Sequence, residues 1–137
     1  MNAISAWPAL GLFLLALAGC ETAVPVDRLR YAAPQMDVEV RGDWRSVNAC
    51  VMDHYSRQSR YLLPDVDDAG QMATLTVFAP RAGRPRSAAS LAEAEVTTVA
   101  LSPTTARSTL RRARPDEAEN GRIRQDLERC GLAVVSS

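Results

Sequence analysis

Met72-Ala73-Thr74-Leu75-Thr76-Val77-Phe78-Ala79 is the stretch that indicates a β-sheet most clearly. Its β-branched and aromatic residues are typical of strands, and a proline follows it. Residues 95–101, E-V-T-T-V-A-L, have the same character. The segment between them, 80–90, is rich in Pro, Gly, Arg and Ser and is expected to be a loop. The two stretches predict neighbouring strands of one sheet.

Helices are expected on either side of these strands. Asp43 can cap a helix from Trp44 to about Arg60, whose apolar residues recur at three- and four-residue steps. The pair Ser102-Pro103 is typical of a helix start and predicts a second helix that ends before Pro115. A third helix is expected at 116–130, because acidic residues open it and a glycine follows it.

Two short strands complete the pattern. Residues 36–40, M-D-V-E-V, alternate apolar and polar, and residues 132–135, L-A-V-V, can form a last strand. If the helical segments after residue 102 are taken together, the order is strand, helix, strand, strand, helix, strand. This order predicts an α+β fold, a small βαββαβ sheet of the ferredoxin-like or split βαβ type with its helices on one face.

The composition is that of an ordered protein without the charge of a nucleic-acid binder. Of the 137 residues, 47% are apolar, which is typical of a globular domain. Sixteen basic and sixteen acidic residues give a formal net charge of zero, whereas nucleic-acid binders usually carry a basic excess. We therefore expect one domain and no nucleic-acid partner.

The first twenty residues have the features of an export signal. Residues 9–19, A-L-G-L-F-L-L-A-L-A-G, carry no charge. They are too few to span a bilayer, which takes about 20 apolar residues, but they match the apolar region of a signal peptide. The alternative interpretation is a buried apolar helix.

Leu17-Ala18-Gly19-Cys20 resembles the lipobox of bacterial lipoproteins. The resemblance implies that the peptide bond before Cys20 is cut and that this residue carries acyl chains such as palmitate, which hold the protein on a membrane. Glu21 follows the cysteine, rather than the Asp associated with inner-membrane retention. The resemblance therefore implies a cell membrane location on the periplasmic side and favours the outer membrane.

This interpretation divides the chain into three parts. They are a signal peptide at 1–19, a lipidated Cys20 with a flexible tether at 20–35, and a single periplasmic α+β domain at 36–137. The tether is expected because residues 21–35 show no sustained period and contain two prolines.

Two further cysteines, Cys50 and Cys130, lie 80 positions apart. An even number of cysteines in an exported protein favours a disulfide. In the chain-entropy model, a disulfide that closes a loop of that length adds about 4 to 5 kcal/mol to the free energy of unfolding. The alternative is a thiol enzyme with Cys50 as nucleophile and His54, the single histidine, as its base. We expect no metal site from these residues, since one histidine and two distant cysteines offer too few ligands.

Residues 64–70 are expected to form an acidic turn. Its sequence from Asp65 to Gly70 is similar to the start of an EF-hand calcium loop, but Thr76 stands where that loop needs its bidentate Glu. The chain also lacks the nucleophile, phosphate-loop and dinucleotide motifs. We therefore expect no metal, no cofactor and no enzymatic activity.

The basic residues are all arginine and are unevenly distributed. Seven lie between residues 81 and 114, where only Glu93 and Glu95 are acidic. Arginine binds phosphate and carboxylate groups bidentately, so these seven are candidate anion-binding residues. They are Arg81, Arg84, Arg86, Arg107, Arg111, Arg112 and Arg114. The alternative is a solvated charged face without a ligand.

Together these features predict a non-catalytic lipoprotein of the bacterial envelope that acts in binding or scaffolding. Its expected partners are the membrane, through the lipid anchor, and a protein of the envelope. An anionic lipid or polysaccharide that binds the arginine clusters is the first alternative. A thiol-dependent enzyme is the second.

Overall fold

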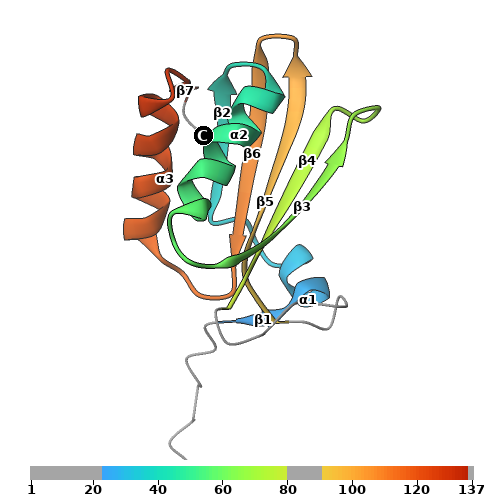
Figure 1. Cartoon of the computed structure of the whole chain (residues 1–137), viewed down its shortest axis with the longest axis vertical. Helices are drawn as coiled ribbons and strands as arrows, with labels where there is room; N and C mark the ends of the chain where they lie inside the picture. Colours follow the sequence, from blue (N-terminus) through green and yellow to red (C-terminus); the bar gives the residue numbers. More distant parts are fainter. Residues whose placement is uncertain (1–22, 80–90, 136–137) are drawn as a thin grey trace, which may run out of the picture.

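The computed structural model describes residues 23–79 and 91–135. These residues form a seven-stranded antiparallel sheet with the order β3-β4-β5-β6-β2-β7, and β1 pairs with β5 (Figure 1). The elements are β1 (Val24–Pro25), α1 (Val26–Arg30), β2 (Met36–Arg41), α2 (Trp44–Ser56), β3 (Tyr61–Asp67), β4 (Met72–Phe78), β5 (Leu91–Ser102), β6 (Thr105–Arg112), α3 (Glu117–Arg129) and β7 (Ala133–Val135). Within the described ranges, no helix is long and apolar enough to cross a bilayer.

The architecture is not the ferredoxin-like βαββαβ fold that the sequence predicted. That prediction is wrong because two segments assigned to other structures are strands. β6 occupies the place of the helix expected after Ser102-Pro103, and β3 covers most of the turn expected at 64–70. Strands β3 to β6 therefore form a continuous meander, to which β2 and β7 are added beyond β6.

The physical reasons for both differences lie in the strand pairing. In β6 the buried residues Ala106, Ser108 and Leu110 alternate with more exposed ones, which is the period of a strand. Its small and polar buried residues make this alternation weak in the sequence, and hydrogen bonding to β2 and β5 on both sides decides the structure. β3 is an edge strand, where Pro64 is tolerated because one side of the strand needs no ladder partner.

Elements β2, α2, β4, β5, α3 and β7 follow the sequence prediction closely. Asp43 caps α2, where its Oδ1 accepts hydrogen bonds from the backbone N–H groups of Arg45 and Ser46, each at 3.1 Å. Gly131 follows α3 with a φ of 79°, a conformation that favours glycine. β4 and β5 are the two neighbouring strands predicted at 72–79 and 95–101, and β5 extends beyond its prediction at both ends.

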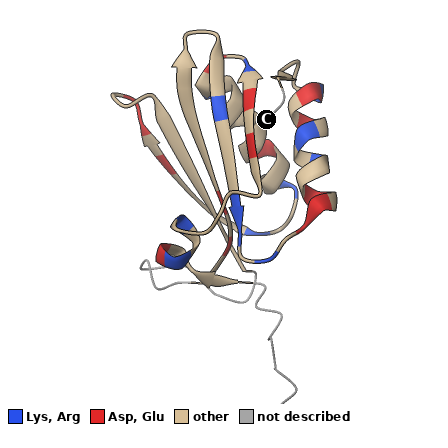
Figure 2. Ribbon diagram, turned by 180° about the vertical axis from the view of Figure 1, so that it is seen from behind, with Lys and Arg blue, Asp and Glu red and all other residues tan. Residues whose placement is uncertain are grey.

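The main core lies between one face of the sheet and the helices α2 and α3, which cover that face together (Figure 1). Apolar side chains from β2, β4, β5 and β6 pack there against Trp44, Val47 and Val51 of α2 and Ile123 and Leu127 of α3. Figure 2 shows the sheet from the opposite side, where most strand residues are uncharged and basic and acidic residues are scattered among them. Helices α2 and α3 therefore lie side by side on the apolar face of the sheet.

The opposite face is covered at one end by β1 and α1. Val24, Val26 and Leu29 pack there with Phe78 and Ala92 in a second, smaller core. Burial of these apolar side chains holds residues 24–30, within the segment 20–35 that was expected to be a tether, on the sheet. Cys20 lies outside the described residues.

Candidate functional site

Cys50 and Cys130 form the disulfide that the sequence predicted. Their Cα atoms are 6.3 Å apart, and the bridge joins α2 to the end of α3. Cys50 is buried, whereas Cys130 is exposed. The thiol that the enzyme alternative required is therefore engaged in a covalent bond.

His54, one turn after Cys50 on α2, lies between two carboxylates of α3. Its Nδ1 is 2.6 Å from Asp126 Oδ2, and its Nε2 is 2.6 Å from Glu119 Oε1. The side chain is 5% exposed. A carboxylate accepts hydrogen bonds, so both contacts are satisfied together by the imidazolium form, which has an N–H group on each nitrogen. The result is an ion cluster between the helices.

Further donors stabilise the ionised form of Glu119. Gln58 Nε2 donates to its Oε1 at 2.6 Å, and Arg122 Nε donates to its Oε2 at 2.7 Å. Burial opposes the ionisation of Glu119. The hydrogen bonds from Gln58, His54 and Arg122 outweigh that effect and lower the pKa of Glu119 to about 2.

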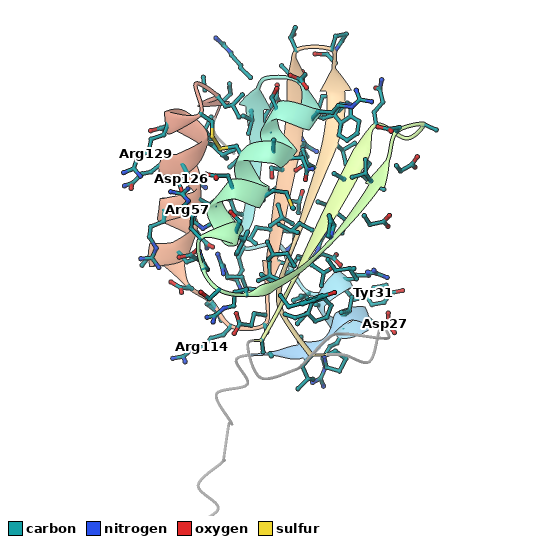
Figure 3. All side chains as sticks on the ribbon, viewed as in Figure 1. Asp27, Tyr31, Arg57, Arg114, Asp126 and Arg129 are labelled. Carbon is teal, nitrogen blue, oxygen red and sulfur yellow. A yellow bond between two sulfur atoms is a disulfide. The ribbon has the colours of Figure 1, made fainter. Side chains whose placement is uncertain are left out.

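Asp126 is surrounded by cations from both helices (Figure 3). Arg57 Nη2 of the α2 end donates to its Oδ2 at 3.0 Å, and Arg129 Nη1 donates to its Oδ1 at 3.1 Å. The hydrogen bond with His54 is the largest cause of a lowered pKa of Asp126, and the charges of the two arginines act in the same direction against burial. Asp126 thus remains ionised beside His54.

The seven candidate arginines do not gather in one patch among the described residues. Arg107 and Arg111 lie on the open face of the sheet, where Arg107 pairs with Asp37 at 3.6 Å. Arg112 is directed to the opposite face, because neighbouring residues of a strand alternate in direction. Arg114 follows β6. Arg81, Arg84 and Arg86 lie outside the described residues.

Arg112 and Arg114 instead share a pocket with Arg60, which sequence reasoning did not single out. The pocket has a volume of about 430 Å³ and lies where β5 begins, β6 ends and α3 begins. Its lining residues are Arg60, Glu93, Arg112, Arg114, Pro115 and Asp116. We call it the arginine pocket.

The side chain of Arg112 is half-buried and hydrogen-bonds to neutral groups. Its Nε donates to Asn120 Oδ1 at 2.9 Å, and its Nη2 donates to Tyr55 Oη at 3.3 Å. Burial raises the pKa of Tyr55 to about 12, although Arg112 acts in the opposite direction, so the phenol stays neutral at pH 7. Within the described ranges no carboxylate forms an ion pair with Arg112. The acids that share its pocket, Glu93 and Asp116, therefore lie beyond ion-pair distance of its guanidinium.

Two further buried donors lie next to Arg112. Asn120 Nδ2 and Arg60 Nε are buried and have no hydrogen-bond acceptor among the described residues. Arg60 Nε is 2.9 Å from Glu93 Oε2, but this ion pair lacks hydrogen-bond alignment. Unsatisfied buried donors cost free energy. Of these two residues, Arg60 also lines the arginine pocket.

The acidic residues 65–68 serve the β3–β4 hairpin. Asp65 and Asp67 lie in β3 rather than in the expected turn, and Asp67 Oδ1 accepts a hydrogen bond from the Gly70 N–H at 2.9 Å. Asp68 accepts from Arg45 Nη2 at 2.8 Å. In the part of the chain that the structure describes, no group of three His, Cys, Asp or Glu side chains is placed to hold a metal.

Comparisons with known proteins add no relative. The chain matches no protein-family model, no curated protein and no solved structure. The site geometry and the N-terminal sequence are therefore the grounds for a functional proposal.

Proposed function

We propose that this chain is a lipid-anchored protein of the bacterial envelope whose domain binds an anionic group in the arginine pocket without catalysis. Arg112 is the observation that carries the binding proposal, because a half-buried guanidinium with only neutral partners is suited to a phosphate or carboxylate. The lipobox-like Leu17–Cys20 supports the anchor, and Glu21 after it favours the outer membrane. The disulfide supports the periplasm, since disulfides persist in oxidising compartments.

The charges that line the arginine pocket favour an anionic ligand. Of its two acids, Glu93 pairs with Arg60, and Asp116 caps α3 by accepting from the Glu119 N–H at 2.9 Å. Arg112 and Arg114 are left without an acidic partner among the described residues. A phosphate of a lipid headgroup or a polysaccharide can accept bidentate hydrogen bonds from such side chains.

Two contacts favour a binding role over the thiol-dependent enzyme. A Cys50 in a disulfide has no thiolate to attack a substrate. His54, the base that such an enzyme would use, has a carboxylate at hydrogen-bond distance from each ring nitrogen. Both residues therefore stabilise the α2–α3 pair in this proposal.

Thermal unfolding with inorganic phosphate tests the binding proposal. A Cys20→Ser variant without the signal peptide supplies the soluble domain. We expect phosphate at ten times its Kd to add about 1.4 kcal/mol to the free energy of unfolding. The Arg114→Ala variant should lose this gain, whereas Arg124→Ala, an arginine of α3 outside the arginine pocket, should keep it. No gain in the parent domain, or the same gain in both variants, would rule out this site.

A further inference from the structure

The folded domain begins almost directly after the expected lipidation site. Val24, in β1, is 8% exposed and stands four positions after Cys20. Four residues span at most about 14 Å, whereas the sixteen-residue tether expected from the sequence would reach about 50 Å. The ordered β1–α1 segment therefore removes most of the distance that could separate the domain from an anchor at Cys20.

The β1–α1 end of the domain and the β5–β6 turn are farther apart than the chain between Cys20 and Val24 can reach. β5 has 12 residues and runs from its pairing with β1 to the turn that leads into β6. A strand of that length covers about 35 to 40 Å. An anchor within about 14 Å of Val24 therefore keeps the β1–α1 end near a membrane, whereas the β5–β6 turn can lie about 35 to 40 Å farther away.

The β1–α1 end presents side chains that suit a headgroup layer. Tyr31, after α1, is 90% exposed, and Leu91, at the start of β5, is 47% exposed. Amphipathic aromatic residues are favoured at membrane interfaces, and arginine binds phosphate. Arg114 lies at the same end, since the Ala113 N–H donates to Glu93 O at 2.9 Å near the start of β5 (Figure 3).

We infer that the β1–α1 end, with Tyr31, Leu91 and Arg114 on its surface, sits directly on the headgroup layer of the bilayer that carries the lipid anchor. The inference rests on the proposed lipidation of Cys20. It names the partner of this surface as anionic lipid headgroups and sets the domain upright, with the β5–β6 turn farthest from the membrane. The arginine pocket then opens next to the headgroups.

Fluorescence quenching by a headgroup-labelled lipid tests this orientation on the lipidated protein that starts at Cys20. The protein is purified from its membrane, checked by intact mass, and reconstituted in vesicles of phosphatidylethanolamine and phosphatidylglycerol that contain a nitroxide headgroup lipid. Leu91→Trp and Leu101→Trp are a matched pair, because both leucines lie in β5 and are 47% and 48% exposed. Tyr31→Trp is the second probe of the membrane end, and the native Trp44 is the common background.

We expect the added fluorescence of Leu91→Trp and Tyr31→Trp to be quenched several-fold more than that of Leu101→Trp. Weak quenching of all three probes in a protein whose mass includes acyl chains would overturn the inference and leave the proposed anchor intact. Stronger quenching of Leu101→Trp would overturn the orientation. A mass without acyl chains would overturn the proposed function, and the inference with it.

Discussion

His54 Nδ1 lies 2.6 Å from Asp126 Oδ2, one helical turn from the bond between Cys50 and Cys130. His54 follows Cys50 by four residues on α2, and Asp126 precedes Cys130 by four residues on α3. The disulfide and the ion cluster therefore join the same two helices at successive turns. The disulfide restricts the unfolded chain, whereas the ion cluster also fixes how the two helix surfaces face each other.

Replacing His54 should destabilise the domain strongly. His54→Ala leaves Glu119 and Asp126 without their shared cation in a largely buried place, which we expect to lower the free energy of unfolding by about 2 to 4 kcal/mol. Urea unfolding monitored by circular dichroism measures this change. Glu128→Ala, an exposed α3 residue, serves as control and should stay within about 0.5 kcal/mol of the native protein. A His54→Ala domain as stable as this control would show that the ion cluster contributes nothing.

Acid should weaken the domain through Glu119. Because its pKa in the folded protein is lowered from 4.5 to about 2, its contribution to stability is complete above the unfolded value and is lost as the pH falls from about 5 towards 2. Glu119→Gln removes this titration. The difference in free energy of unfolding between the native protein and Glu119→Gln should therefore be large at pH 7 and shrink at pH 3. An equal difference at both pH values would argue against this carboxylate as the acid-sensitive group.

Truncation of Leu29 should release α1 from the sheet. Leu29 is fully buried in the small core with Phe78 and Ala92, and removal of such a side chain costs about 2 to 4 kcal/mol. In Leu29→Ala we expect faster amide hydrogen exchange over residues 24–32 and unchanged protection of β4 and α2. The control Tyr31→Ala should not change exchange, since Tyr31 is 90% exposed. Unchanged exchange in Leu29→Ala would mean that other contacts hold α1.

Removal of the disulfide should cost less than the chain-entropy value. The double variant Cys50→Ala/Cys130→Ala is expected to lose about 2 to 4 kcal/mol, because the unfolded chain without the bond keeps some structure and gains less entropy than the model assumes. Since the disulfide acts on the unfolded chain and the ion cluster on the folded one, combination with His54→Ala should cost about the sum of the two changes, which urea unfolding of all the variants measures in a double-mutant cycle. A cost well above the sum would show that the two connections support each other in the folded protein.

The elements that the sequence revealed are those with strong local signals. β4 and β5 are rich in β-branched residues, and α2 and α3 begin at Asp43 and Asp116, whose side chains cap them. β6 was missed because Ala106 and Ser108 supply little apolar contrast with the arginines beside them. α1 was missed because a five-residue helix is too short to show a period, and its stability comes from Phe78 and Ala92 far along the chain.

The candidate sites also differ in whether a local sequence signal reveals them. The disulfide followed from a count of cysteines and the expected compartment. The partners of His54 could not be found by spacing, because Glu119 and Asp126 are 65 and 72 positions away. Seven arginines were predicted to bind anions because they lie in one basic segment of the sequence. Neighbouring residues of a strand point to opposite faces of the sheet, so Arg111 and Arg112 lie on different faces. Arg60 joins Arg112 only in the folded protein.

The proposal of a lipid-anchored envelope protein is tested most directly by intact mass spectrometry. The protein is taken from its native membrane and measured with and without reduction and alkylation. We predict a chain that starts at Cys20 with added acyl chains, in which Cys50 and Cys130 are alkylated only after reduction. A mass without acyl chains, or a Cys50 that reacts before reduction, would contradict the proposed anchor or the periplasmic disulfide, respectively.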